Sequence, residues 1–188
     1  MMNYKDTALV LIDLQKGILA MDTAPHSTAT VVQNAKELAA RFKQNGGFVA
    51  YVRVNFHDGQ DALKPNAMKQ LPGKPQADFS DFADELAVEE KDYIVNKRGF
   101  SAFFGTDLDL QLRRRGIKNI VLGGISTHVG VDTTARDAYQ LGYDQYFVED
   151  MMSAPAAELH AFSLTHTLPL MGQIVSFEDM MAEERFNQ

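Results

Sequence analysis

The chain has 188 residues, 45% apolar and 23% charged, a balance typical of globular proteins, so we expect a single domain spanning residues 1–188. Its formal net charge of -7 disfavours nucleic acids and anionic membranes as partners, because both attract basic surfaces. The absence of cysteine excludes disulfides, thiolate catalysis and cysteine-ligated metals.

The sequence also carries no signal for export or membrane insertion. Its first residues lack the basic region, apolar stretch and cleavage site of a secretion signal. No window approaches the ~20 apolar residues that a membrane span requires. We therefore expect a cytoplasmic protein.

In the N-terminal half, residues 8–14 and 48–54 are nearly continuous apolar runs, typical of parallel strands covered on both faces. Between them, Ser27 or Thr28 can cap a helix that runs to about residue 43 and ends at glycines. Residues 55–80 predict a long loop, either a substrate lid or an oligomer contact, and a weak strand follows at 93–95.

In the C-terminal half, Thr106 can cap a helix that ends at Gly116, and residues 119–123 predict the next strand. The remaining elements are expected helices at about 131–141, 158–165 and 177–184, with strands at 145–148 and 173–175 between them. This alternation predicts an α/β fold with a doubly wound, mainly parallel sheet. The long loop and the apolar residues Phe177, Met180 and Met181 offer surface to cover, so we expect a homo-oligomer.

Polar residues follow three of these strands, where ligands bind in such sheets. Asp13 ends the first strand, Lys97 follows the weak strand, and residues 123–130 join a strand to a helix. Asp13 and Lys97 can form a partly buried ion pair of the kind found at active sites. The alternatives are an aspartate that caps a loop and a lysine on the surface.

The segment 123–130 reads GGISTHVG. Its glycines allow the backbone to approach a ligand closely, and the first amides of a helix starting near His128 can bind an anion or oxyanion. Thr127 as the helix N-cap is the alternative. His128 is either a pocket wall or a packed residue at the start of the helix.

Three segments, ALVLIDLQ, NKRGFSAFFGTDLDLQLRRRGIKNIVLGGISTHVGV and TTARDAYQLGY, resemble the isochorismatase-like, or cysteine hydrolase, superfamily. The resemblance extends from about Thr7 to Asp150 and is strongest to an uncharacterised cysteine-less branch with a GIST-x-x-GV turn. It implies a three-layer αβα fold, related to the Rossmann fold, and a hydrolase.

The family's Asp, Lys and Cys triad matches Asp13, Lys97 and Gly130, so the nucleophile is replaced by glycine. In true isochorismatases glycine also replaces the cysteine, so the resemblance is compatible with activity but not with a covalent thioester. It further implies a cis peptide at Ile125–Ser126 and an oxyanion hole formed by the amides of Ser126 and Gly130.

Other residues are expected to contact the substrate or support the site. Gln15 matches the family's Asp-x-Gln and is expected to brace the site. Arg53 and Lys97 are candidates for holding substrate carboxylates, with His128 as a third. Four phenylalanines can line the cleft, with core packing as the alternative for each. The full substrate-binding set is Gln15, Arg53, Phe56, Phe100, Phe103, Ser126, Thr127 and His128, with Phe104 as a further lining candidate.

The sequence predicts neither a cofactor nor a metal site. Nicotinamidases of this superfamily hold a metal with an Asp-x-His motif and further histidines. The matching stretch here is Asn55-Phe56-His57, and His26 is the only other histidine before His128. His57 is therefore expected to be an ordinary loop or lid residue.

The leading expectation is a cofactor-free hydrolase of a small anionic metabolite. In the isochorismatase version, Asp13 is a general acid that protonates an enol ether before water adds. One alternative is amide-type hydrolysis by water that Asp13 activates as a base. The other is a non-catalytic binding or scaffold protein that keeps the pocket. Burial favours the protonated form of Asp13, and Lys97 opposes it.

Overall fold

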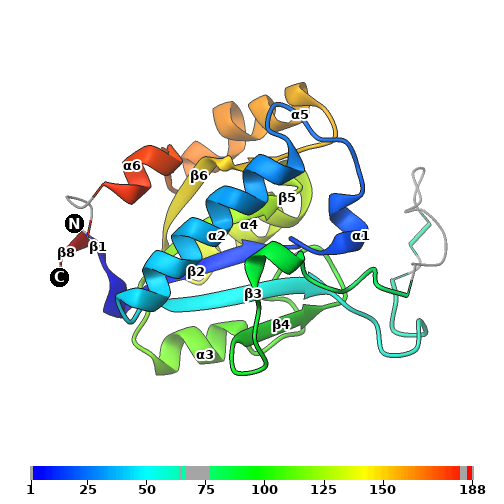
Figure 1. Cartoon of the computed structure of the whole chain (residues 1–188), viewed down its shortest axis with the longest axis horizontal. Coiled ribbons are helices and arrows are strands. Elements are labelled where there is room, and N and C mark those ends of the chain that lie inside the picture. Colours follow the sequence, from blue (N-terminus) through cyan, green and yellow to red (C-terminus); the bar gives the residue numbers. More distant parts are fainter. Residues whose placement is uncertain (1, 64, 67–76, 183–185, 188) are drawn as a thin grey trace.

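The computed structural model describes residues 2–63, 65–66, 77–182 and 186–187. Its centre is a six-stranded parallel sheet in the order β4-β3-β2-β5-β6-β7 (Figure 1). The order reverses between β2 and β5, so the sheet is doubly wound, as the alternation of strands and helices predicted. The strands are β2 (Thr7–Ile12), β3 (Phe48–Val54), β4 (Tyr93–Lys97), β5 (Asn119–Ile125), β6 (Asp144–Ser153) and β7 (Gln173–Val175).

Helices cover both faces of this sheet, which confirms the three-layer αβα arrangement. One face carries α2 (Thr28–Gln44) and α6 (Phe177–Met181). The other carries α3 (Leu108–Arg114) and α4 (Asp132–Gln140), together with the turns that follow α5 (Ala157–Phe162). We call these the α2 face and the α4 face.

Smaller elements complete the chain. A short helix, α1 (Lys16–Leu19), follows β2 directly. A two-stranded parallel pair, β1 (Met2–Asn3) and β8 (Phe186–Asn187), brings the two ends of the chain together (Figure 1). None of the helices in the described ranges is long and apolar enough to cross a bilayer.

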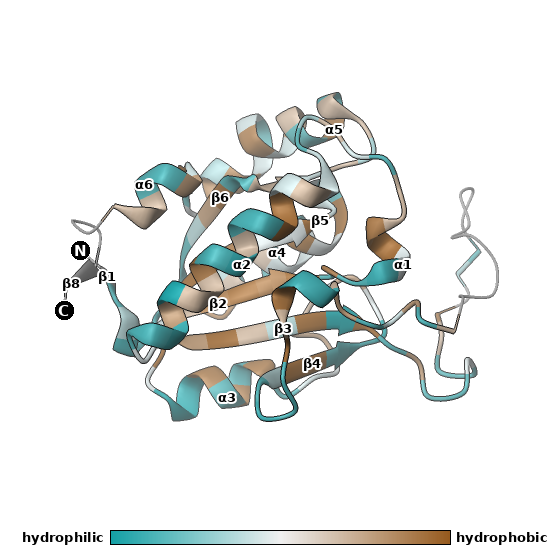
Figure 2. Cartoon of the chain, viewed as in Figure 1, coloured by the Kyte–Doolittle hydropathy of each residue, from teal (hydrophilic) through white to brown (hydrophobic). Residues whose placement is uncertain are grey.

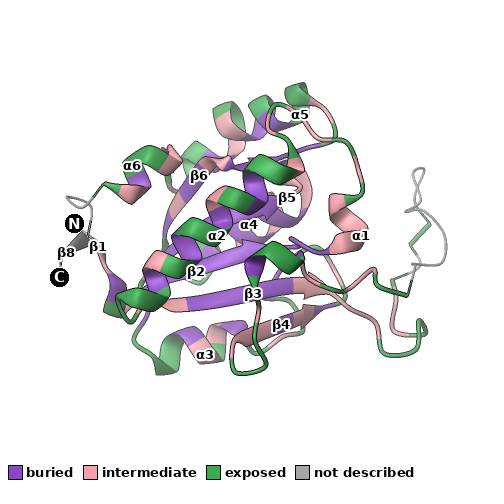
Figure 3. Cartoon of the chain, viewed as in Figure 1, coloured by how far each residue is buried: buried purple, intermediate pink, exposed green. Residues whose placement is uncertain are grey.

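The central strands are buried on both sides, which explains their continuous apolar sequences. In β2, Leu9 and Leu11 belong to the core under the α2 face, whereas Val10 and Ile12 belong to the core under the α4 face. Figure 2 shows β2 and β3 as hydrophobic ribbons, and Figure 3 shows them buried for most of their length, with the outer side of α2 exposed.

Helix α2 begins and packs as its sequence predicted. The Ser27 hydroxyl accepts a hydrogen bond from the Thr30 amide at 3.1 Å and so caps the helix. Its apolar positions include Leu38 and Phe42, both fully buried, and the Phe42 ring meets Tyr4 edge-on. This stripe fastens α2 to the sheet.

The structure adds detail at two places, near the C-terminus and in the turn before α4. Met180 is buried in the core under the α2 face, and Phe177 and Met181 are partly buried against it, so they offer less free surface for oligomer contacts than expected. Helix α4 starts at Asp132 because a π turn precedes it, in which the Val131 amide donates to the Ser126 carbonyl at 3.2 Å. Residues 64 and 67–76 of the expected long loop lie outside the described ranges.

A glycine lets β5 approach β2 at the point where the strand order reverses. Gly124 has a φ of 129° and is paired with Ile12, and a Cβ added to it would lie 2.1 Å from the Ile12 carbonyl oxygen. Both the conformation and the space therefore require glycine.

We expect Gly124→Ala to destabilise the fold by roughly 3 kcal/mol, since it combines backbone strain with a clash against main chain. Urea unfolding followed by circular dichroism measures this. Gly99→Ala is the matched control, because an added Cβ there would meet only Leu63 Cδ1, at 3.7 Å. Equal stability of the two variants would contradict this account of the strand contact.

Candidate active site

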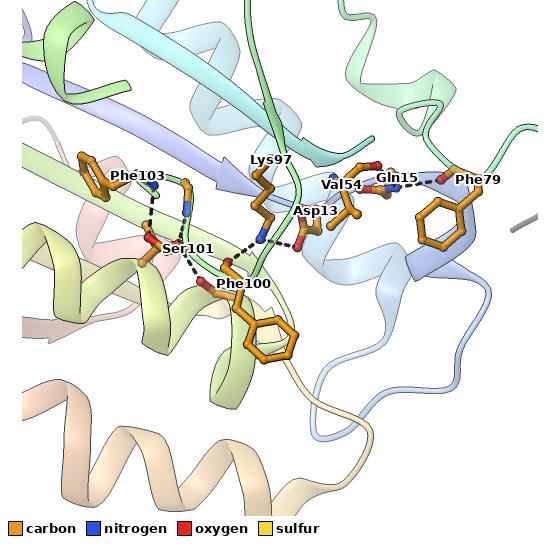
Figure 4. Close-up of polar contacts among 11 residues, drawn as sticks. Asp13, Gln15, Val54, Phe79, Lys97, Phe100, Ser101 and Phe103 are labelled. Atoms are coloured by element: carbon orange, nitrogen blue, oxygen red, sulfur yellow. Dashed lines mark hydrogen bonds and ion pairs between the residues drawn. The ribbon is translucent and has the colours of Figure 1, made fainter. Parts of the chain in front are cut away.

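A buried ion pair joins the ends of β2 and β4, which lie on either side of β3 in the sheet. Lys97 Nζ lies 2.8 Å from Asp13 Oδ2, and the two side chains are 1% and 7% exposed. Asp13 turns out of its strand with a φ of 54°, a conformation that aspartate adopts more readily than most residues. Lys97 donates a second hydrogen bond, of 2.6 Å, to the Phe100 carbonyl (Figure 4).

This environment shifts the acidity of Asp13. Burial raises the pKa of its carboxyl group to about 6, while the charge of Lys97 and its hydrogen bond act in the opposite direction. The second oxygen, Oδ1, is buried and makes no hydrogen bond within the described part of the chain. Asp13 therefore has one oxygen held by Lys97, one oxygen without a partner, and a protonation change close to neutral pH. These are the properties expected of an acid or base in catalysis.

Gly130 faces this pair from the π turn that precedes α4. A Cβ added to Gly130 would lie 3.2 Å from Asp13 Oδ2 and from Lys97 Nζ, and 3.0 Å from Ile12 Cγ2. The structure thus brings Asp13, Lys97 and Gly130 together at the switch point of the sheet, on the α4 face. Any side chain at position 130 would touch both charged groups.

The turn between β5 and α4 carries the expected cis peptide between Ile125 and Ser126. The Ser126 carbonyl accepts hydrogen bonds from the amides of Val129 and Val131. Ser126 occupies the N-cap position of this turn. Thr127 is therefore not the N-cap, and the alternative given for it in the sequence analysis is wrong.

Thr127 instead contacts a histidine that the sequence reasoning missed. Its hydroxyl lies 2.8 Å from His160 Nδ1, and both side chains are buried. Burial lowers the pKa of His160 to about 4, so this ring is neutral at physiological pH. His160 lies on α5, 33 residues further along the chain, and no local pattern connects it to the turn.

His128 lies in the same turn and is half-buried. Its Nδ1 atom is shielded from solvent and has no hydrogen-bond partner within the described residues. Burial lowers the pKa of the imidazole, which favours the neutral ring. A neutral ring is a weak candidate for holding a carboxylate.

Gln15 braces the site and is completely buried. Its side-chain amide donates to the carbonyls of Phe79 and Val54, at 2.8 and 3.2 Å, and accepts from the Val54 amide at 2.7 Å (Figure 4). These bonds occupy the amide group and tie the ends of β2 and β3 to the following loop. Gln15 is therefore placed to support the strand ends, and not to contact substrate.

Arg53 does not lie beside Lys97. It shares the α2 face of β3 with Tyr51, whereas Lys97 shares the α4 face of β4 with Val95. The Arg53 guanidinium donates to Asn96 Oδ1 and to the Ser80 carbonyl and lies over the Phe82 ring. The expectation that it holds a substrate carboxylate next to Lys97 is contradicted by this geometry.

The phenylalanines divide between core and surface. Phe103 is 9% exposed and stacks on Tyr143, so it belongs to the core under the α4 face and does not line a cleft. Phe100 is 55% exposed and Phe104 is 79% exposed. Phe56 is half-buried in the loop after β3. Of the four, Phe100 is tied most directly to the ion pair, through its carbonyl.

Across the described ranges, no three His, Asp or Glu side chains are grouped so that they could hold a metal ion. The His57 amide donates to the Asp61 carboxylate in the loop after β3. The absence of a metal requirement remains a prediction.

Comparison with known proteins connects this geometry to a family. The sequence matches the isochorismatase domain over residues 7–179. It is 47% identical over 184 residues to YwoC, an uncharacterised isochorismatase family protein of Bacillus subtilis (strain 168), covering 96% of this chain and 95% of that protein. It is 32% identical over 174 residues to the ureidoacrylate amidohydrolase RutB of Variovorax paradoxus (strain S110), covering 79% of this chain and 69% of that protein. The solved structure of an isochorismatase family protein from Burkholderia thailandensis is similar with a TM-score of 0.86 at 40% identity, covering 93% of both chains.

The raised pKa of Asp13 predicts a pH-dependent contribution to stability. The folded state holds this proton up to about pH 6 and the unfolded state only up to its ordinary value of 3.8, so the contribution is present below pH 4 and is lost as pH rises to about 6. The loss is on the order of 3 kcal/mol.

Urea unfolding of the natural protein and of Asp13→Asn between pH 4 and 7 isolates this contribution, because other carboxylates affect both proteins equally. The stability of the natural protein relative to the variant should fall across this interval. A difference that stays constant with pH would show that Asp13 has an ordinary acidity.

Proposed function

Because the chain belongs to the isochorismatase family of hydrolases, we propose that it hydrolyses a small anionic metabolite without a covalent intermediate, with Asp13 as the residue that transfers the proton. The observation that carries this proposal is the buried Oδ1 atom of Asp13, which has no partner in the described part of the chain and belongs to a carboxyl group with a pKa of about 6. The chain contains no cysteine, which excludes a covalent thioester intermediate.

In the first candidate reaction, the substrate is an enol ether. Protonated Asp13 donates its proton to the vinyl carbon, and the resulting oxocarbenium ion takes up water. The hemiacetal or hemiketal then breaks down to a carbonyl compound and an alcohol, and the proton that water releases returns to Asp13. Lys97 holds Oδ2, so that the transferred proton resides on Oδ1.

Glycine at position 130 supports direct attack by water. A larger residue there would contact both Asp13 and Lys97 and would occupy the region beside the carboxyl group. We propose that the amides of Ser126 and Gly130 hold a negatively charged oxygen of the substrate in this region.

The charge distribution limits the proposed substrate. Of the two cations expected to bind substrate carboxylates, Lys97 lies at the site and Arg53 lies on the other face of the sheet. We therefore propose a substrate with one carboxylate near the reacting bond. Isochorismate, which carries two carboxylates, is a poorer fit.

Amide hydrolysis is the second candidate, favoured by the 32% identity to a ureidoacrylate amidohydrolase. Here ionised Asp13 removes a proton from the attacking water, the turn amides stabilise the oxyanion, and the proton passes to the leaving nitrogen as the C–N bond breaks. The two reactions need opposite protonation states of the same carboxyl group.

A panel of small enol ethers, ureido acids and other monocarboxylates, screened by thermal shift and then by turnover, tests both candidates. With Asp13 as the acid, kcat/KM should be constant below about pH 6 and fall above it, whereas with Asp13 as the base it should rise to about pH 6 and then level off. Asp13→Asn and Lys97→Met should each lower turnover by about 100-fold or more.

Circular dichroism of both variants is the control for folding. Native turnover in both folded variants would show that the site is misplaced. Tight binding of panel members without turnover would replace the proposed activity by a binding function.

A further inference from the structure

One segment singled out in the sequence, TTARDAYQLGY, contributes no residue to the triad. It forms most of α4, and its second residue, Thr134, lies four positions after Gly130. Residues four apart lie on the same side of a helix, so Thr134 is directed toward the same region as Gly130. Its side chain is 1% exposed.

The Thr134 hydroxyl makes two buried hydrogen bonds. It donates to the Gly130 carbonyl at 2.7 Å and accepts from the Ala102 amide at 3.0 Å. The first is the ordinary bond of a threonine to its own helix. The second links α4 to the loop after β4, 32 residues away in sequence, and needs a hydroxyl at this position.

That loop carries the second acceptor of Lys97. The Phe100 carbonyl, which accepts from Lys97 Nζ at 2.6 Å, lies two residues before Ala102. The loop is also fixed by a bond from the Phe103 amide to the Ser101 hydroxyl and by one from the Thr106 hydroxyl to the Ala102 carbonyl. Figure 4 shows Lys97 reaching between Asp13 and the Phe100 carbonyl, with Ser101 and Phe103 following in the same loop.

We propose that Thr134 is a positioning residue that keeps Lys97 in contact with Asp13, by holding the loop of residues 100–103 against α4. Removal of the hydroxyl leaves the buried Ala102 amide without its acceptor, so the loop must move to satisfy it. The Phe100 carbonyl moves with the loop, and Lys97 Nζ then loses this acceptor and keeps only its contact with Asp13.

This inference rests on the proposed function in taking Asp13 as the proton-transferring group, and its test uses no substrate. Lys97 is the charged side chain in contact with Asp13, and it lowers the pKa of that carboxyl group. If Thr134 holds Lys97 in place, Thr134→Val should move the titration midpoint of Asp13 upward by about one pH unit.

The midpoint is measured by ¹³C NMR of carboxyl-labelled aspartate, with the Asp13 signal identified as the one missing from Asp13→Asn. Thr134→Ser retains the hydroxyl and should keep the natural midpoint. Thr133→Val is the matched control, because the neighbouring Thr133 is half-buried and its hydroxyl makes no hydrogen bond within the described residues. Thr134→Ala removes the hydroxyl with a smaller side chain, in case Thr134→Val does not fold.

A double-mutant cycle separates positioning from a general effect on packing. In a Lys97→Met background, Thr134→Val should cause no further change of the Asp13 midpoint. The proposal is overturned if a folded Thr134→Val or Thr134→Ala protein titrates like the natural one, if the shift persists without Lys97, or if neither variant folds. A failed search for turnover, with these shifts observed, would remove the proposed function and leave the role of Thr134 intact.

Discussion

The contact between Asp13 and Lys97 is the interaction on which the rest of the site depends. Removing two charges from water is costly, and a buried pair offsets that cost only when geometry and additional hydrogen bonds are favourable. Here Lys97 has two acceptors, Asp13 Oδ2 and the Phe100 carbonyl, whereas Asp13 keeps one oxygen without a partner in the described residues. The lysine is therefore well satisfied and the aspartate is not, which is why burial raises the pKa of Asp13 to about 6 in spite of the adjacent positive charge. A carboxyl group with one oxygen that lacks a partner in the described residues is suited to giving or taking a proton.

The doubly wound topology places this pair where it can act. Asp13 leaves β2 at the switch point, and the neighbouring strand β5 leads into the turn that carries Gly130. Glycine has a different purpose at two positions of this region. At Gly124 it allows the main chains of β5 and β2 to approach each other, and at Gly130 it avoids a Cβ in close contact with the two buried charged groups. The loop after β4 holds Lys97 through the Phe100 carbonyl, and the contact of Thr127 with His160 fixes the turn before α4.

The fold could be predicted from the sequence because its central strands are buried on both faces and so appear as apolar runs, bounded by helices with clear caps and glycine stops. The positions of Asp13, Lys97 and Gly130 followed from strand ends and from family resemblance.

The sequence did not predict which face of the sheet some side chains occupy, or which contacts form between segments that are distant along the chain. Arg53 was placed in the site because the sequence gives no register between neighbouring strands, and register decides which face a side chain occupies. For Phe103 the sequence allows either a cleft or the core, because a single phenylalanine has the same pattern in both, and the structure places it in the core. His160 and the second bond of Thr134 join segments about 30 residues apart, for which no local pattern exists.

The central claim is that position 130 touches a pair of groups able to move a proton and stabilise a negative charge. The most direct measurement is the alkylation rate of Gly130→Cys with iodoacetamide, since the natural chain contains no cysteine and the introduced thiol reports on this position alone. Gly130→Ala serves as the control for the fit of a side chain against Ile12. If Asp13 accepts the thiol proton and Lys97 stabilises the thiolate, the thiol should react faster than free cysteine at pH 7, and Asp13→Asn or Lys97→Met should each slow it about tenfold or more. A folded variant whose thiol reacts no faster than free cysteine and does not respond to either replacement would contradict the account.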